Sequence, residues 1–222
     1  MPRQSSAMTT PRVADRRLEQ RFIGAINGCY TLADRRLVRG TGVEVFACRT
    51  QSISPFAAAV TAPVLGVIGD GLTARLDGLG IIRGEIERHL EDGFVFTLVA
   101  SEDQRNKLAK RLASLRRRSV VDVQDKRGFE RHKPIDPRSV ITLADGTALR
   151  CFVIDLSRSG AALSADIAPE IGTSLVVGKL ACTVVRPLDV GFVVRFDAVA
   201  DASELELLVT GFDVRGDALA AQ

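Results

Sequence analysis

The sequence has 222 residues, of which 46% are hydrophobic and 26% are charged, and its formal net charge is +3. This composition is typical of a folded protein with a hydrophobic core and excludes an intrinsically disordered chain. The length fits either one large domain or two small ones.

The first residues, MPRQSSAMTTPRVADRR, contain no apolar run of the kind that marks a secretory signal. The most apolar stretch, residues 55–69, contains two prolines and many small residues. It falls short of the roughly 18 to 20 apolar residues that a membrane-spanning helix needs. We therefore expect a cytoplasmic protein without a membrane span.

The cysteines and histidines show no spacing typical of a metal site or of a disulfide framework. We expect the cysteines to be small buried hydrophobic residues, at positions Cys29, Cys48, Cys151 and Cys182. No Ser/His/Asp arrangement, H-E-x-x-H motif or phosphate-binding loop is present in the sequence. The sequence thus predicts no catalytic residues, no metal and no enzymatic activity.

The chain contains an internal repeat. Residues 89–98, HLEDGFVFTL, match residues 187–196, PLDVGFVVRF, at an offset of 98. Residues 48–62, CRTQSISPFAAAVTA, parallel residues 151–165, CFVIDLSRSGAALSA, at an offset of 103. Matching blocks in the same order, with offsets that drift by a few residues, indicate a duplicated domain with altered loops.

A third block of the repeat consists of paired arginines. Arg17 and Arg21 parallel Arg127 and Arg131 at an offset of 110. Each pair has the spacing R-x-x-x-R and precedes the rest of its repeat, so both units begin in the same way.

The segment between the repeats, residues 101–118, predicts a helix. Ser101 and Gln104 have the spacing of a capping box. The apolar residues that follow fall on one helical face: Leu108, Leu112 and Leu115. The equivalent segment of the second unit, residues 201–212, predicts another helix, for which Gly211 is a plausible stop.

Within the units, short apolar runs with turn residues between them predict β-strands. Residues 140–156 have Asp145-Gly146 at their centre, the usual signal for a two-residue hairpin. Further strands are expected within residues 173–186 and 189–196. Many short strands at close spacing predict a small barrel or a sandwich, followed in each unit by a helix.

Basic residues cluster between the two units. Residues 105–133 contain eleven Lys or Arg and only three acidic residues. A basic connector between otherwise acidic regions suggests an anionic partner. For the helical part, residues 105–118, a solvated helix face explains the charge at least as well.

The segment KRGFERHKP and the later string DLSRSG together suggest a site for guanine and phosphate. The planar guanidinium groups of Arg127 and Arg131 can each donate two parallel hydrogen bonds to the O6 and N7 edge of guanine or to phosphate. Asp155 offers an acceptor for the N1 and N2 hydrogens of the base, and Ser157 offers a hydroxyl. Gly160 allows a close approach of the backbone.

RGFER followed by DLSRSG resembles the paired signature of PilZ domains, R-x-x-x-R and then [D/N]-x-S-x-x-G, and the resemblance covers roughly residues 120–200. It implies a six-stranded β-barrel that binds the bacterial second messenger cyclic di-GMP. The fold expected is therefore mainly β, with two small PilZ-like barrels of about six strands each, each followed by a helix. The ligand residues implied are Lys126, Arg127, Arg131, Asp155, Ser157 and Gly160.

The chain departs from the family pattern in both units. The family often has consecutive arginines where this chain has Lys126, Arg127 and Gly128, which leaves one guanidinium fewer. In the first unit, Ser52 stands where the motif has its aspartate and Ala57 where it has its glycine. We interpret residues 1–118 as a degenerate PilZ-like barrel with a C-terminal helix, and residues 119–222 as the ligand-binding PilZ domain.

The leading hypothesis is a receptor that is not an enzyme and needs no cofactor. It binds cyclic di-GMP and signals by rearranging its domains or by binding a protein partner, which the sequence does not identify. One alternative is a nucleic-acid-binding protein that uses residues 105–133, although aromatic residues interleaved with the basic ones are lacking. Another is a PilZ-like scaffold that binds no ligand.

Overall fold

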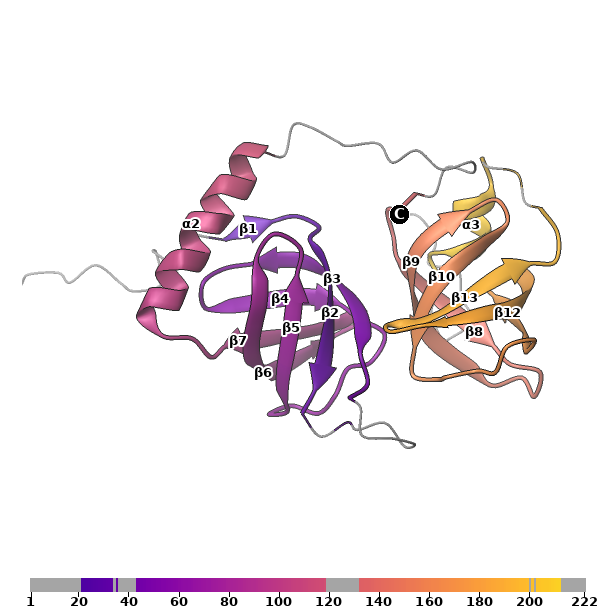
Figure 1. Cartoon of the computed structure of the whole chain (residues 1–222), viewed down its shortest axis with the longest axis horizontal. Helices are drawn as coiled ribbons and strands as arrows, with labels where there is room; N and C mark the ends of the chain where they lie inside the picture. The colour runs from indigo at the N-terminus through magenta and orange to yellow at the C-terminus, as the bar shows by residue number, and fades with distance from the viewer. Residues whose placement is uncertain are drawn as a thin grey trace, which may run out of the picture.

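The computed structural model describes residues 21–33, 35, 43–118, 132–199, 201 and 203–212. They form two closed β-barrels that lie side by side, each followed in sequence by a helix (Figure 1). The predicted fold, mainly β with two small barrels, is therefore confirmed.

The first barrel is a ring of antiparallel strands in the order β3-β2-β5-β6-β7-β4, closed by pairing of β4 with β3. The two-residue strand β1 pairs with the end of β3 that extends beyond β2. Its elements are β1 (Phe22–Ile23), β2 (Asn27–Leu32), β3 (Phe46–Ile53), β4 (Ala57–Thr61), β5 (Gly71–Leu76), β6 (Gly80–Leu90), β7 (Gly93–Leu98) and α2 (Glu102–Arg118).

The second barrel has the same connectivity, with the strand order β9-β8-β11-β12-β13-β10. Strands β8 to β13 thus take the places of β2 to β7. Its elements are β8 (Arg138–Thr142), β9 (Ala148–Ser157), β10 (Gly160–Ala165), β11 (Ser174–Val177), β12 (Leu180–Leu188), β13 (Gly191–Phe196) and α3 (Leu205–Val209).

The two barrels also share their irregularities. A register shift leaves Gln51 as an extra residue between β3 and β4, and another leaves Ile154 between β9 and β10. The same happens at Glu87 in β6 and at Val185 in β12. These pairs of bulges are separated by the offsets of 103 and 98 found in the sequence. A bulge bends its strand locally, so both copies bend at matching positions.

Matching glycines begin the last strand of each barrel. A Cβ on Gly93 would lie 1.8 Å from the carbonyl oxygen of Val60, and one on Gly191 would lie 1.9 Å from that of Leu163. Neither site has room for a side chain, which explains why the glycine recurs in both copies.

Each barrel encloses its own hydrophobic core, built by alternation along the strands. In β5, Leu72, Ala74 and Leu76 are buried. The first core contains an aromatic cluster, in which the rings of Tyr30 and Phe94 meet edge to face at 5.4 Å. The second core consists mainly of aliphatic residues.

Helix α2 begins with the predicted capping box. The backbone N of Ser101 donates to Oε1 of Gln104 at 2.9 Å, and the backbone N of Gln104 donates to Oγ of Ser101 at 3.3 Å. Leu108 and Leu112 are buried in the first core, and Leu115 packs against it. The prediction of this helix is confirmed, including its apolar face.

Helix α3 is shorter than the segment proposed for it, and the chain leaves it through Gly211, which has a φ of +79°. The backbone N of Gly211 donates to the carbonyl oxygen of Arg138 at 2.9 Å, which ties the helix to β8. The predicted hairpin between β8 and β9 exists, but its loop spans residues 143–147. The expectation of a two-residue turn was wrong. The backbone N of Leu143 donates to the carbonyl oxygen of Thr147 at 2.9 Å, and the backbone N of Thr147 donates to Oδ1 of Asp145 at 2.8 Å, so the loop closes over more residues.

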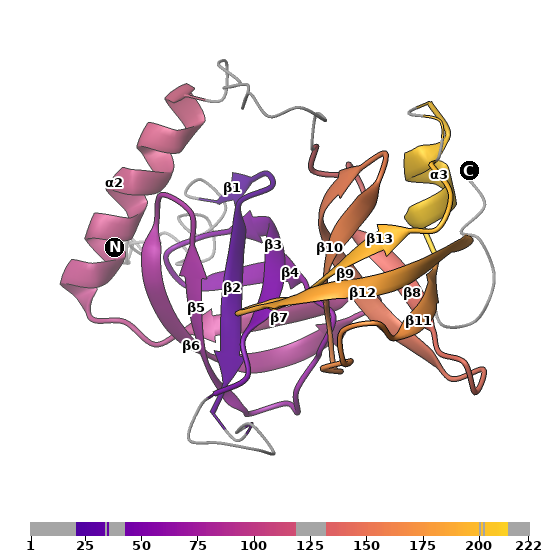
Figure 2. The same cartoon turned by 45° about the vertical axis from the view of Figure 1, so that its right-hand side comes forward.

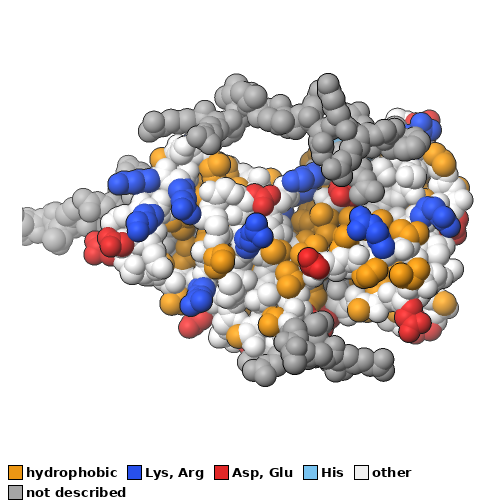
Figure 3. All heavy atoms as spheres, viewed as in Figure 1, with side chains coloured by type: hydrophobic (Ala, Val, Ile, Leu, Met, Phe, Trp, Pro, Cys, Tyr) orange, Lys and Arg blue, Asp and Glu red, His pale blue; other side chains and the backbone are white. Residues whose placement is uncertain are grey.

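The barrels contact each other through β3 of the first barrel and through β9 and β10 of the second. Figure 2 shows β3 on the side of the first barrel that faces β9 and β10. The backbone N of Ala47 donates to Oγ of Ser164 at 3.0 Å, and Nη1 of Arg150 donates to the carbonyl oxygen of Glu91 at 3.0 Å. Arg35 forms an ion pair with Asp166 across the same contact. Hydrophobic side chains are visible along the junction in Figure 3.

Candidate functional site

The string DLSRSG forms the tight hairpin between β9 and β10. Strand β9 ends at Ser157 and β10 begins at Gly160, so Arg158 and Ser159 make the turn. The Ser157 side chain is buried, and its hydroxyl donates to the carbonyl oxygen of Gly160 at 3.1 Å. The serine of the motif therefore holds the shape of the turn.

The glycine of the motif also has a structural reason. A Cβ on Gly160 would lie 2.1 Å from the carbonyl oxygen of Val194, because β13 passes close to β10 there. This packing requirement explains the glycine whether or not a ligand approaches it. In the first barrel, Ala57 takes the same place opposite Thr97.

The bulge at Ile154 determines which way the motif aspartate faces. Val153 and Leu156 are both fully buried although they are three residues apart. Strict alternation would place them on opposite faces of the strand. Because of the extra residue, Ile154 and Asp155 are instead both half-buried. Bulges of this kind often re-aim a side chain at a functional site.

The connector meets the motif at His132, where the described chain resumes. The backbone N of His132 donates to the carbonyl oxygen of Leu156 at 3.0 Å, and the N of Leu156 donates back at 2.9 Å. Leu156 lies between the aspartate and the serine of the motif. Three predicted ligand residues of the connector lie outside the described residues: Lys126, Arg127 and Arg131.

The first barrel contains the counterpart of this arrangement. Phe22, which follows Arg21 as His132 follows the second arginine of the connector, pairs with Ile53 of β3. Nη2 of Arg21 donates to Oγ of Ser52 at 2.5 Å. Ser52 occupies the position of the motif aspartate. In this copy the second arginine of R-x-x-x-R thus contacts the first residue of the degenerate motif.

Helix α2 covers the motif hairpin of the first barrel. The guanidinium of Arg105 lies 5.1 Å from the ring centroid of Phe56, which is in the hairpin turn. Arg116 donates to the backbone carbonyl of Arg21. Ser54 donates to the carbonyl oxygen of Ala57 at 3.2 Å, as Ser157 does to Gly160 in the second barrel.

The solvated face expected for residues 105–118 is present at most of its described basic residues, because Arg111 and Arg116 are exposed, and Arg105 is the exception. Arg105 is half-buried over an aromatic ring, and Nη1 of Arg111 donates to the carbonyl oxygen of Leu79 at 2.5 Å. Lys107 and Lys110 are exposed. In Figure 3, Lys and Arg side chains gather at the end of the molecule that α2 forms.

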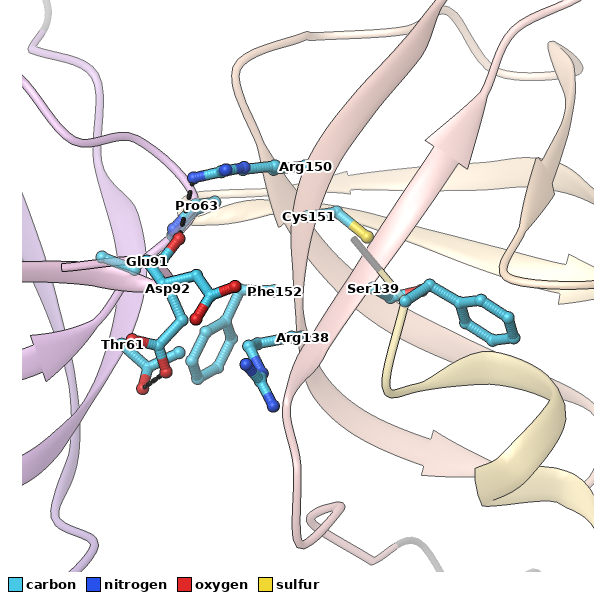
Figure 4. Close-up of a pocket in the computed structure, with 11 residues that line it drawn as sticks. Thr61, Pro63, Glu91, Asp92, Arg138, Ser139, Arg150, Cys151 and Phe152 are labelled. Atoms are coloured by element: carbon cyan, nitrogen blue, oxygen red, sulfur yellow. Dashed lines mark hydrogen bonds between the residues drawn. The ribbon is translucent and has the colours of Figure 1, made fainter. Parts of the chain in front are cut away.

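A small pocket lies between the barrels, close to Phe152 (Figure 4). Figure 4 shows the ring of Phe152 lying between the barrels, with Asp92 and Arg138 beside it. The Arg138 guanidinium is held by Asp136 at 2.6 to 3.0 Å, which raises the pKa of Arg138. This pocket has a cavity volume of about 30 Å³, which suits a water molecule and is too small for a nucleotide.

The cysteines are free thiols, and three of them are buried: Cys48, Cys151 and Cys182. Burial raises the pKa of Cys151 and that of Cys182 to about 12. Among the described residues no group of His, Cys, Asp and Glu is arranged to hold a metal ion. The part of the chain that the structure describes also contains no helix long and apolar enough to cross a membrane.

No protein-family model and no curated protein sequence matches the chain. Among solved structures, it is similar to the inhibitor of motility MotI/DgrA of Bacillus subtilis, with 12% identity and a TM-score of 0.28, covering 83% of this chain and 92% of that one.

It is also similar to MrkH of K. pneumonia in its complex with c-di-GMP, with 10% identity and a TM-score of 0.25, covering 82% of this chain and 83% of that one. The chain is also similar to YcgR of Escherichia coli in complex with c-di-GMP, with 13% identity and a TM-score of 0.28, covering 88% of this chain and 83% of that one. TM-scores this low do not establish a common arrangement, so these likenesses give no support to a particular function for this chain.

Proposed function

We propose that the protein is a receptor for cyclic di-GMP that binds this ligand with its second barrel, as the resemblance to the PilZ signature implies. The observation that carries the proposal is the backbone pairing of His132 with Leu156. It places the chain that follows R-x-x-x-R directly against the strand that bears D-x-S-x-x-G. Two unrelated short motifs would not need to meet in this way.

The chemistry of the site follows from the residue types. Asp155 accepts hydrogen bonds from N1 and N2 of guanine, and Arg131 donates to O6 and N7 of the base or to phosphate. Arg131 directly precedes His132, and successive Cα atoms are about 3.8 Å apart. The pairing of His132 with Leu156 therefore keeps the backbone of Arg131 close to the motif. The contact between Arg21 and Ser52 supports this reach, because it joins the equivalent residues of the first copy.

The remaining site residues have supporting roles in this proposal. Arg127 gives a second planar donor, and Lys126 adds a positive charge near the phosphates. Ser157 and Gly160 keep the hairpin in shape, through the hydroxyl contact and the close approach of β13.

The two units have different tasks. Residues 119–222 bind the ligand, whereas residues 1–118 have Ser52 in place of the carboxylate and have α2 over the equivalent hairpin. We propose that the first barrel has little ligand affinity and that binding alters how the barrels contact each other, which signals to a protein partner in the cytoplasm.

The contacts of α2 weigh against the nucleic-acid alternative. Arg105 packs on Phe56, and Arg111 and Arg116, although exposed, each donate a hydrogen bond to a backbone carbonyl oxygen of the first unit. A surface for nucleic acid needs such groups free to reach phosphates, and the salt dependence of binding measures their number. Steeply salt-dependent binding to DNA, with no response to cyclic di-GMP, would favour that alternative.

Calorimetric titration of the full chain with cyclic di-GMP tests the proposal. Asp155→Ala removes the acceptor for the base and is expected to weaken binding about tenfold to a hundredfold, the range for hydrogen bonds to a charged group. Asp189→Ala removes an exposed acid in the turn between β12 and β13 and serves as the matched control. Equal affinity of the two variants would contradict the proposed site.

A further inference from the structure

Residues 132–135, which come directly after the arginine motif, form a strap between the barrels. The second barrel holds the strap through the pairing of His132 with Leu156. Helix α3 holds it through Glu206, whose Oε1 accepts from the backbone N of Ile135 at 2.6 Å.

The first barrel holds the strap through Arg49 of β3. Nη1 of Arg49 donates to the carbonyl oxygen of Pro134 at 2.7 Å and to that of Ile135 at 3.1 Å. Nε of Arg49 donates to Oδ1 of Asn27 at 3.1 Å, which fixes the plane of the guanidinium. The guanidinium also lies 5.9 Å from the ring centroid of Phe152 in the second barrel.

Arg49 is a costly residue to place here. Arg49 is only 8% exposed, and burial lowers its pKa, while the carboxylates of Asp136 and Glu206 oppose that shift. A buried guanidinium is tolerated when hydrogen bonds satisfy it. Much of that satisfaction comes from the strap, so the strap and this face of the first barrel depend on each other.

The internal repeat shows that the barrel itself does not need an arginine at this position. The residue equivalent to Arg49, at an offset of 103, is Phe152. Phe152 is buried at the same place in β9, and its side chain has no hydrogen-bond donor. The guanidinium of Arg49 therefore serves the contact between the units rather than the fold of one unit.

We infer that Arg49 is a positioning residue of the first barrel that sets the strap for ligand binding by the second barrel. This inference rests on the proposed function. The strap begins one residue after Arg131. If Arg49 holds the strap in place, the end of the arginine motif that is joined to the strap has a fixed position. By linkage, ligand binding then strengthens the contact between Arg49 and the strap, and thereby couples the ligand to the arrangement of the barrels.

The test compares Arg49→Met, which keeps an apolar stem, with Arg49→Lys, which keeps the charge but not the planar fork. Arg88→Met, at an exposed position on β6, is the matched control. The first readout is hydrogen exchange of the His132, Ile135 and Leu156 amides in the ligand-free protein. We expect exchange about tenfold faster in Arg49→Met, from the loss of hydrogen bonds to a charged group, and no change in Arg88→Met.

The second readout is the affinity for cyclic di-GMP, measured with the thermal midpoint of each variant. We expect Arg49→Met to weaken binding at least about fivefold, the lower end of typical coupling between sites, and Arg49→Lys to recover only part of it. A lower thermal midpoint with unchanged affinity would overturn the positioning role. Unchanged amide exchange in both Arg49 variants would show that Arg49 does not hold the strap. Absence of binding by the wild type would refute the proposed function, whereas the exchange data would still decide whether Arg49 holds the strap.

Discussion

Replacing Gly160 by alanine is expected to destabilise the second barrel, because the added Cβ has no room. It would lie 2.1 Å from the carbonyl oxygen of Val194, where β10 pairs with β13. Overpacking of this kind costs about 1 to 3 kcal/mol. The opposing atom belongs to the backbone of a closed barrel, so we take the upper end. Alanine also lowers the conformational entropy of the unfolded chain, which favours the folded state by about 0.4 to 1 kcal/mol. The expected net loss in the free energy of unfolding is therefore about 2 kcal/mol.

Urea unfolding followed by far-ultraviolet circular dichroism measures this loss, with hydrogen exchange in β10 and β13 to locate it. Gly146→Ala is the control in the same barrel, because Gly146 has a φ of +84° but no atom within 4 Å of the added Cβ. That change tests backbone strain alone, and we expect it to cost about 1 kcal/mol less than Gly160→Ala. If Gly160→Ala were as stable as the wild type, the structural explanation of the motif glycine would be wrong.

Three further predictions concern separate features. Arg131→Ala should weaken cyclic di-GMP binding about tenfold to a hundredfold, with little rescue by lysine, whereas Lys110→Ala on the exposed face of α2 should change it less than about threefold. If Arg131→Lys bound the ligand as tightly as the wild type, the connector would act only through its positive charge, and the proposed planar contact would be wrong. Leu112→Ala should lower the free energy of unfolding of the first barrel by about 2 to 5 kcal/mol, again against Lys110→Ala, and a loss below about 1 kcal/mol would contradict the packing of α2. The raised pKa of Cys151 and of Cys182 adds stability that is present below the usual pKa of 9.0 and is lost as the pH rises toward about 12, so the urea midpoint should fall over that range. A midpoint that stays constant up to about pH 11 would contradict this.

Features that depend on local chemistry could be predicted from the sequence. The capping box of α2 could be recognised because Ser101 and Gln104 bond within one turn of helix. The duplicated barrel could be recognised because equivalent strands of both copies carry similar residues at fixed offsets, such as Gly93 and Gly191, which leave no room for a side chain. The hairpin of DLSRSG likewise follows from turn residues placed between two apolar runs.

Features that depend on tertiary contacts could not be predicted. The sequence gives no sign that Arg105 differs from the other basic residues of its helix, yet its guanidinium packs over the ring of Phe56 in a hairpin far away in the sequence. Arg49 gives no sequence signal as a strap-binding residue, because its partners are backbone carbonyl oxygens, which look the same in every residue. The loop of residues 143–147 differed from expectation because Thr147 extends the turn by bonding to Leu143.

The most direct test of ligand recognition is a pair of calorimetric titrations of the full chain, one with cyclic di-GMP and one with cyclic di-AMP, at the same ionic strength. The two ligands carry the same phosphates, but adenine lacks the O6 acceptor and the N1 and N2 hydrogens that Asp155 and Arg131 are proposed to bind. We predict that cyclic di-GMP binds at least about tenfold to a hundredfold more tightly, the range for one specific base contact. Equal affinity for the two ligands, or no binding of cyclic di-GMP, would contradict a guanine site built from R-x-x-x-R and D-x-S-x-x-G.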